Sequence, residues 1–294
     1  MKSTLILALL RFLALLPLSW QRRLGTLCGD IAFLANTRMA KTTHTNLAIA
    51  FPELSEEERR KLAHASLRQT FKAICEAGST WLWPPERALA SIERVIGFDL
   101  LKAGAESGKG VVLCSPHLGN WELFGLWLNT CGLGQTHQLF QPPSDPRIAE
   151  VIYKARSRTG ANMVATDKQG VSMLLRALRA GEVVGILPDQ VPPDESGEFA
   201  PFFNRPALTM TLVNRLAQKT GARILVGVVR RTEKGFEIEM IEPDGSIYSS
   251  DLVEALTGLN RTVETLVRKT PEQYAWEYKR YKRQPEGMSS PYRA

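Results

Sequence analysis

The sequence is poor in cysteine. Its four cysteines, Cys28, Cys75, Cys114 and Cys131, are widely spaced among 294 residues and form no C-x-x-C motif. Small secreted proteins that depend on disulfides are much denser in cysteine, whereas isolated cysteines in apolar surroundings are typical of reduced, buried thiols. The sequence therefore argues against a disulfide scaffold and indicates a protein body in a reducing compartment.

Motifs for metals and nucleotides are also lacking. His44, His64 and His137 have no cysteine or acidic partner at the spacing of zinc ligands. The glycine-rich stretch 104–110 is one residue shorter than a phosphate-binding loop, ends in glycine where a hydroxyl is required, and precedes a strand instead of following one. We therefore expect a turn at this stretch, and neither a metal nor a cofactor in the protein.

No apolar run reaches the roughly 20 residues that a bilayer-spanning helix needs. The apolar segment Leu5–Leu18 is interrupted by Arg11 and Pro17, and no clear small-residue cleavage site accompanies it. These features favour a hydrophobic helix within residues 1–25 that anchors the protein in the membrane interface. A tilted spanning helix and an ordinary buried helix are the alternatives. Four basic side chains would then face anionic headgroups: Arg22, Arg23, Arg38 and Lys41.

Acidic residues are outnumbered by basic ones, 30 against 37, which gives a formal net charge of +7. Such a protein attracts anions, whether nucleic acid, an acidic carrier protein or an anionic lipid surface. The segment Pro271–Arg283 interleaves aromatic and basic residues, which suits a phosphate-bearing surface. The same pattern is equally typical of a solvated basic segment whose aromatic side chains pack on the core. Lys282 and Arg283 are its candidates for contact with a membrane or a carrier.

The remaining chain alternates between helical and strand patterns. Ser55–Trp83 predicts an amphipathic helix, with Ser55 and Glu58 in capping-box positions. Short strands are expected at 111–114, 183–187 and 224–229, helices at 146–159, 170–180 and 208–220, and a late strand, antiparallel to its neighbour, at 236–241. This order predicts an α/β fold with a central mixed, mostly parallel sheet flanked by helices. Because no linker or repeat interrupts residues 26–294, we expect one domain after the anchor.

His117 is the most informative candidate for catalysis. It follows directly on the apolar strand at 111–114, and ligands of α/β sheets bind at the carboxyl ends of strands. An imidazole that titrates near neutral pH is a good general base for a hydroxyl, and a carboxylate on its other nitrogen fixes its orientation. Glu122 can supply that carboxylate if the chain bends at Gly119 and Asn120. Cys114, inside the strand, is a weaker candidate for a covalent nucleophile.

The run from His117 to Glu122 resembles the H-x4-E box of the lipid A biosynthesis late acyltransferases, within the lysophospholipid acyltransferase superfamily. Three further segments are similar to blocks of that family in the same order. These are Arg158, with Arg156 as a close competitor; the stretches 187–190 and 201–209; and the closing segment 271–285. The similarity spans nearly the whole chain, including its hydrophobic start, and four boxes in order are more specific than one.

The resemblance implies transfer of a fatty acyl chain from acyl carrier protein to a hydroxyl of a phosphorylated glycolipid, the lipid A precursor, without metal or cofactor. His117 would be the base and Glu122 its orienting partner, with Asn120, Arg158 and Asp189 binding or supporting the substrate. The location implied is the cytoplasmic face of a bacterial inner membrane, and nucleic acid is not expected as a partner. Two alternatives remain: a phospholipid acyltransferase using the same pair, and a protein that binds membrane surfaces or nucleic acid through its basic aromatic tail.

Overall fold

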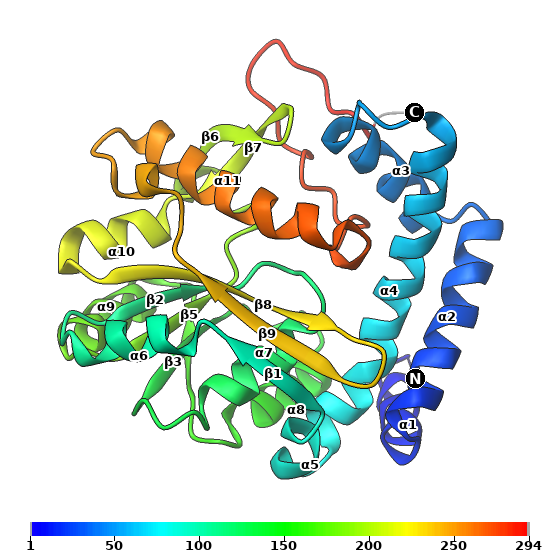
Figure 1. The fold of residues 1–294 in the computed structure, drawn as a ribbon, viewed down its shortest axis with the longest axis horizontal. Helices are drawn as coiled ribbons and strands as arrows, with labels where there is room; N and C mark the ends of the chain where they lie inside the picture. The colour runs from blue at the N-terminus through cyan, green and yellow to red at the C-terminus, as the bar shows by residue number, and fades with distance from the viewer. Residues whose placement is uncertain (1, 293–294) are drawn as a thin grey trace.

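A computed structural model describes residues 2–292, which fold around a seven-stranded sheet (Figure 1). Its strands are β1 (Ile92–Ile96), β2 (Val111–Cys114), β3 (Thr136–Phe140), β4 (Asn162–Ala165), β5 (Val183–Ile186), β8 (Arg223–Arg231) and β9 (Phe236–Ile241). Their order is β1-β9-β8-β2-β5-β3-β4, and all neighbours are parallel except β8 and β9. The expected mixed, mostly parallel sheet is therefore confirmed, including the antiparallel late strand.

Helices cover both faces of this sheet (Figure 1). They are α5 (Pro85–Leu89), α6 (Phe98–Glu106), α7 (Trp121–Leu128), α8 (Pro146–Ser157), α9 (Lys168–Arg179), α10 (Leu212–Thr220) and α11 (Leu252–Lys269). Val112 and Cys114 of β2 pack into the core on the side of α9, α10 and α11, whereas Val111 and Leu113 pack on the side of α6 and α7. Because both faces of β2 are covered, the strand is apolar at every position.

The stretch 208–220 divides between two elements. A separate antiparallel hairpin pairs β6 (Gly197–Phe202) with β7 (Arg205–Met210), so the expected helix begins only at Leu212. The short strands β1, β3 and β4 were not predicted. They lack the continuous burial of β2, since β1 and β4 contain exposed positions and β3 contains two half-buried ones. Three 3₁₀ turns, η1 (Asp194–Ser196), η2 (Gly245–Tyr248) and η3 (Pro271–Gln273), complete the described secondary structure.

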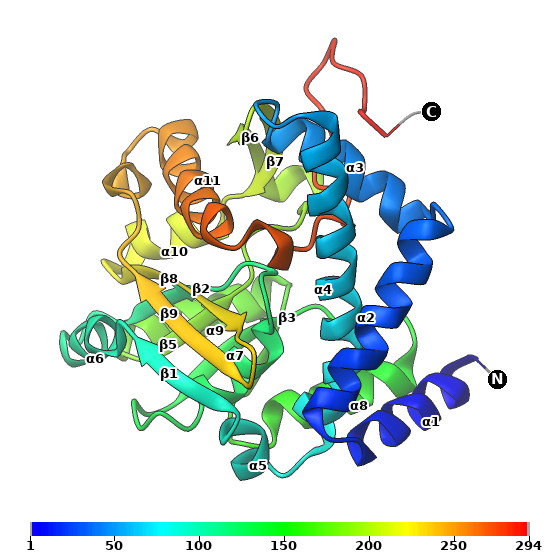
Figure 2. The ribbon, with the colours of Figure 1, turned by 45° about the vertical axis from the view of Figure 1, so that its right-hand side comes forward.

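Four helices precede the sheet: α1 (Lys2–Leu15), α2 (Leu18–Leu34), α3 (Arg38–Ala50) and α4 (Glu56–Leu82). The long helix α4 stands between α2 and the sheet, as both views show (Figure 1, Figure 2). Its predicted capping box is present, with Ser55 and Glu58 bonding each other's backbone amides. The proposed anchor, residues 1–25, therefore comprises α1 and the first half of α2. Within residues 2–292, no helix combines the length and apolar content that crossing a bilayer requires.

The structure overturns one expectation about basic side chains and distinguishes between the two interpretations of the closing segment. Arg22 does not face headgroups, because its guanidinium is buried and forms an ion pair with Glu76 of α4. Tyr274, Trp276 and Tyr281 of the closing segment belong to the hydrophobic core, so these aromatic rings do not form an exposed binding surface. The alternative interpretation, in which the aromatic side chains pack on the core, describes this segment.

Candidate active site

The loop after β2 is held between β8 and the closing segment. Gly119 has a φ of +64°, and a Cβ at this position would lie 1.7 Å from the carbonyl oxygen of Val229. Only glycine fits this close approach in a left-handed conformation. Leu118 forms a β-bridge with Tyr274 on the other side, so the backbone of the loop that carries His117 is fixed at both neighbouring segments.

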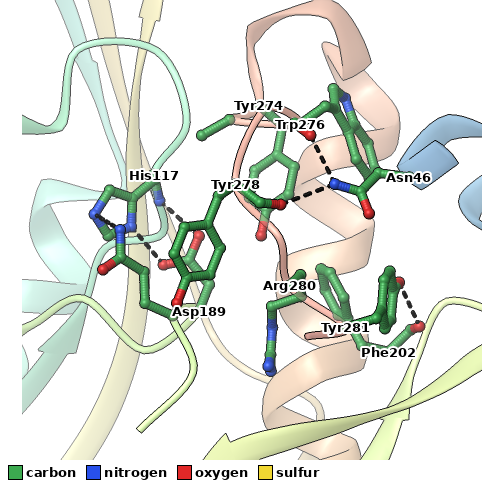
Figure 3. A pocket seen from close by; sticks show the side chains of 11 residues that line it. Asn46, His117, Asp189, Phe202, Tyr274, Trp276, Tyr278, Arg280 and Tyr281 are labelled. Atoms are coloured by element: carbon green, nitrogen blue, oxygen red, sulfur yellow. Dashed lines mark hydrogen bonds and ion pairs between the residues drawn. The ribbon is translucent and has the colours of Figure 1, made fainter. Parts of the chain in front are cut away.

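His117 is paired with Asp189 (Figure 3). Asp189 lies in the loop after β5, and β5 is a neighbour of β2 in the sheet. Nδ1 of His117 lies 2.7 Å from Oδ1 of Asp189, and the His117 backbone amide donates to Oδ2 at 2.8 Å. Burial raises the pKa of Asp189, but the charge and the hydrogen bonds of His117 outweigh burial and bring the pKa below its ordinary value. An ionised carboxylate therefore holds the imidazole at Nδ1.

The second ring nitrogen of His117 faces a polar side chain at the surface. Nε2 lies 3.1 Å from Nε2 of the exposed Gln190. Because Nδ1 donates its proton to Asp189, Nε2 carries the lone pair and accepts from the Gln190 amide. The indole of Trp121 packs against the imidazole at a ring-centroid distance of 4.9 Å. A substrate hydroxyl that takes the place of the amide would meet the basic nitrogen directly.

Glu122 does not supply the hydrogen bond to His117 that the sequence suggested. Both of its oxygens are occupied by Arg156 of α8, with Arg156 Nε donating to Oε2 at 2.9 Å and Nη2 donating to Oε1. Burial raises the pKa of Glu122, but the charge and hydrogen bonds of Arg156 prevail and lower it overall. The carboxylate at His117 comes from Asp189, while Glu122 forms a bidentate ion pair with Arg156 beside the same loop.

Arg158 lies at a helix end and not beside His117. Its guanidinium donates to the last carbonyls of α4, at 2.8 Å to Thr80, 3.1 Å to Trp81, and also to Trp83. These carbonyls have no partner within the helix, so Arg158 acts as a C-terminal cap. Of the two arginines, the one that contacts Glu122 beside the His117 loop is Arg156, which the sequence offered only as a competitor.

Asn120 is a structural residue of the same loop. Its Oδ1 accepts from the backbone amide of Leu123 and thereby caps the N-terminus of α7. Its Nδ2 donates to the side chains of Glu76 and Thr80 in α4, at 3.3 and 3.1 Å. The Asn120 side chain is buried, and both its amide oxygen and its amide nitrogen are hydrogen-bonded. Asn120 therefore positions the loop and α7 against α4.

A buried charge cluster supports this loop from behind. Glu76 is fully buried and accepts from Arg22 Nε at 2.9 Å and from Arg231 Nε at 2.7 Å. Arg231 in turn donates through Nη2 to the carbonyl oxygen of Gly119 at 3.0 Å. Helix α2, helix α4, strand β8 and the catalytic loop are therefore joined by one ion-pair cluster, which the sequence analysis did not identify.

Three cavities surround the His117 loop. One of about 10 Å³ lies between His117, Asp189 and the aromatic side chains of the closing segment (Figure 3). A second, of about 40 Å³, lies under α7 and is lined mainly by apolar side chains of α7, β2, β3 and β5. A third, of about 170 Å³, lies between α4 and the closing segment. Trp121 and Glu122 line both the second and the third cavity, so these two spaces adjoin each other at the first turn of α7.

Other candidate chemistry is not supported by the surroundings of its residues. Cys114 is fully buried, and burial raises the pKa of its thiol far above the ordinary value, so the nucleophilic thiolate is disfavoured. The stretch 104–110 forms the end of α6 and the turn before β2. Among residues 2–292, no group of three histidine, cysteine or acidic side chains is placed to hold a metal ion.

The two arginines near α8 give a direct test of this arrangement. We expect Arg156→Lys to lower kcat/KM about tenfold, because lysine cannot hold both oxygens of Glu122. Arg158→Lys is expected to leave kcat/KM within about twofold while lowering the free energy of unfolding by about 1 kcal/mol through lost capping bonds. Steady-state kinetics and urea unfolding of both variants measure this difference. The reverse result would make Arg158 the site residue.

Similarity to known proteins agrees with these features. The profile of the family described as bacterial lipid A biosynthesis acyltransferase matches residues 2–283. The chain is 32% identical over 277 residues to the lipid A biosynthesis lauroyltransferase of Escherichia coli K12, which covers 92% of this chain and 88% of that protein. It is 31% identical to the palmitoleoyltransferase of the same strain, over 92% and 87% of the two chains. It is 24% identical to the myristoyltransferase, over 92% and 82%. This chain thus belongs to the bacterial lipid A biosynthesis acyltransferases.

Proposed function

We propose that the protein transfers a fatty acyl chain from acyl carrier protein to a hydroxyl of a lipid A precursor, with His117 as the general base and Asp189 as its orienting carboxylate. The observation that carries this proposal is the Asp189–His117 pair at the carboxyl end of β2, beside an apolar cavity. This version replaces the His117–Glu122 pair that the sequence suggested.

The proposed reaction is direct. Nε2 of His117 takes the proton of the acceptor hydroxyl while the hydroxyl oxygen attacks the thioester carbonyl of the donor. The tetrahedral intermediate then collapses, its carbon–sulfur bond breaks, and the protonated His117 returns the proton to the leaving thiolate. Asp189 stabilises the imidazolium without taking up the proton, because it is ionised and bonded at Nδ1.

The cavity under α7 suits the acyl chain. Leu113, Phe124 and Leu128 contribute apolar walls, and Glu122 and Arg156 form its most polar lining. An alkyl chain gains free energy by leaving water for such a space, at about 0.8 kcal/mol per buried methylene. The charged pair Glu122–Arg156 lies beside the Trp121 indole, close to where the reacting carbonyl would meet His117.

We also propose attachment to the cytoplasmic face of the inner membrane through α1 and α2. These helices expose nine large apolar side chains: Leu5, Ile6, Leu9, Phe12, Leu15, Trp20, Leu27, Ile31 and Leu34. Exposed Arg23, Arg38 and Lys41 accompany them and can approach anionic headgroups. An apolar surface of this extent is unusual on a protein that stays in water, which supports an interfacial anchor.

The double substitution Leu27→Glu/Ile31→Glu tests the anchor in the full-length protein. Each side chain is 57% exposed, so folding should tolerate the change. We expect affinity for vesicles of phosphatidylglycerol and phosphatidylcholine to fall at least about tenfold, measured by flotation, because two apolar contacts are replaced by charges. Val253→Glu on α11, whose exposure of 44% is similar, serves as control. Equal flotation of all three proteins would rule out this face as the anchor.

To test the proposed function, the purified protein is incubated with an acylated carrier protein and a phosphorylated, acylated glucosamine disaccharide. The mass of the product is then measured by mass spectrometry. The expected product gains one acyl group. A glycerophospholipid acceptor is offered in parallel, because the phospholipid alternative predicts the gain there instead. No transfer to either acceptor would contradict the proposed function.

A covalent route through cysteine makes a separate prediction. Because the Cys114 thiol is buried inside β2, Cys114→Ala should leave kcat within about threefold of the unmodified protein. Loss of turnover in a folded Cys114→Ala protein, together with an acylated Cys114 peptide in the parent protein, would replace direct transfer by an acyl-enzyme mechanism.

A further inference from the structure

The cavity between α4 and the closing segment is not used by the mechanism above, yet it borders the reacting loop. One face of α4, which includes Ala73, Ile74 and Ala77, forms an apolar wall. Gly119, Trp121 and Glu122 bring the cavity to the residues that follow His117. Its volume of about 170 Å³ is comparable to that of protein cavities of about 150 Å³ that admit a six-membered ring.

The polar lining of this cavity contains hydrogen-bonding groups that remain unused. Arg231 Nη1 and Gln69 Oε1 are both buried, and neither has a hydrogen-bond partner within residues 2–292. A native protein leaves few buried polar atoms unsatisfied, and those it leaves frequently belong to ligand sites or hold water. The Arg231 side chain is 3% exposed and already fixed by Glu76 and the Gly119 carbonyl, so the unused N–H is rigidly placed.

Glu277 adds a carboxylate to the same cavity. It lies in the closing segment and accepts from Thr70 Oγ1 of α4 at 3.0 Å. Within the described part of the chain, no lysine, arginine or histidine lies within ion-pairing distance of it. Burial raises the pKa of Glu277, only partly opposed by its hydrogen bonds and by the charge of His117. Glu277 is half-buried, and a carboxyl that is withdrawn from water without a paired cation is costly to keep, which indicates a role beyond stability.

We infer that this cavity binds the sugar of the acyl acceptor, with Glu277 and Gln69 accepting hydrogen bonds from its hydroxyl or amide groups and Arg231 donating one. Amide and carboxylate oxygens, a fixed guanidinium and the neighbouring indoles of Trp81 and Trp121 form the combination that a polyhydroxylated ring requires. The inference rests on the proposed function, because it assigns the glycolipid to a cavity that shares Trp121 and Glu122 with the acyl cavity.

This placement has a geometric consequence for the reaction. Trp121 and Glu122 line both the acyl cavity and the sugar cavity, and the Trp121 ring contacts the base. A donor and an acceptor that occupy the two cavities would therefore meet at Trp121, next to His117. Glu277 is then a residue that determines which acceptor is used, and it takes no part in the proton transfer.

The experiment compares Glu277→Leu and Glu277→Gln with Glu286→Leu, a control at an exposed glutamate later in the same segment. Initial rates are measured with the phosphorylated glucosamine disaccharide lipid and an acylated carrier protein, varying each in turn. We expect Glu277→Leu to raise the acceptor KM about tenfold, since a lost hydrogen bond to a charged group is worth that factor, with donor KM and kcat within about twofold. Glu277→Gln should raise the acceptor KM less than Glu277→Leu does, and Glu286→Leu should leave the acceptor KM unchanged.

A second variant keeps the test independent of the folding of the Glu277 variants. Ala77→Leu adds bulk to the apolar wall of the open cavity and should also raise the acceptor KM at unchanged donor KM. Unchanged acceptor KM in Glu277→Leu and Ala77→Leu would overturn the inference. A raised donor KM in both would do so as well, because the cavity would then hold the donor. If the unsubstituted protein fails to acylate the glycolipid, the proposed function itself fails.

Discussion

Replacing Asp189 by asparagine is expected to lower kcat/KM for acyl transfer by about 10⁴-fold, because an amide at this position permits the wrong imidazole tautomer. Asp189 Oδ1 lies 2.7 Å from His117 Nδ1, and the Asp189 side chain is shielded from solvent. His117→Ala should reduce transfer at least as strongly, since it removes the base itself. Initial rates at saturating and limiting acceptor, with thermal melting to verify folding, measure both effects.

The control for this prediction is Asp194→Asn, because Asp194 is a surface carboxylate that pairs with the exposed Arg283 at 3.1 Å. Its activity should equal that of the unmodified protein. Glu122→Gln distinguishes the two possible partners of the base. If Glu122→Gln abolished transfer while Asp189→Asn retained near-normal rates, the carboxylate that serves His117 in catalysis would be Glu122, as the sequence first suggested.

The difference between these two carboxylates shows what sequence patterns can predict. The apolar strand 111–114 and the glycine after it located His117 correctly at a strand end, because both signals are local. The partner of His117 is 72 residues away and becomes its neighbour only because β5 pairs with β2 in the sheet. Strand order is a property of the whole fold, so the sequence suggested a nearby glutamate where the structure places the Asp189 carboxylate against His117.

The arginines show the same limit at shorter range. Arg156 and Arg158 are two positions apart, which at the end of a helix directs them about 200° apart around its axis. One reaches Glu122 and the other caps α4. The sequence predicts the helix, but it does not predict how that helix is rotated about its axis relative to α7 and α4. It therefore could not show which of the two arginines contacts Glu122.

Buried charges were the least predictable feature. Arg22 was assigned to the membrane surface because basic residues beside an apolar segment are usually exposed. Its partner Glu76 lies 54 positions later in the middle of α4. The closing segment contains another buried basic residue. The guanidinium of Arg280 donates to the carbonyl of Leu208 and to the hydroxyl of Thr209. Composition gives the number of charges, while the tertiary fold determines which of them are paired inside.

The Glu76 cluster leads to the largest predicted effect on stability. In the unsubstituted protein, Arg22 and Arg231 each bind one oxygen of the Glu76 carboxylate. Glu76→Ala would therefore leave both guanidinium groups buried without an anionic partner. Breaking a buried ion pair in this way typically costs about 3–5 kcal/mol, because the remaining charge keeps its desolvation penalty. We expect the urea midpoint of unfolding to fall accordingly, with Glu57→Ala on the exposed face of α4 leaving it nearly unchanged.

The same cluster should also connect stability with catalysis. Arg231 donates to the carbonyl of Gly119, and Asn120 donates to Glu76, so both residues that follow Leu118 are fixed through the cluster. At a temperature where Glu76→Gln remains folded, we expect a kcat reduced about tenfold or more, since small displacements of a catalytic group are expensive in rate. Combined measurement of unfolding and turnover separates the two contributions. A Glu76→Gln protein that unfolds within 1 kcal/mol of the parent and retains full kcat would show that the cluster neither stabilises the fold nor positions His117.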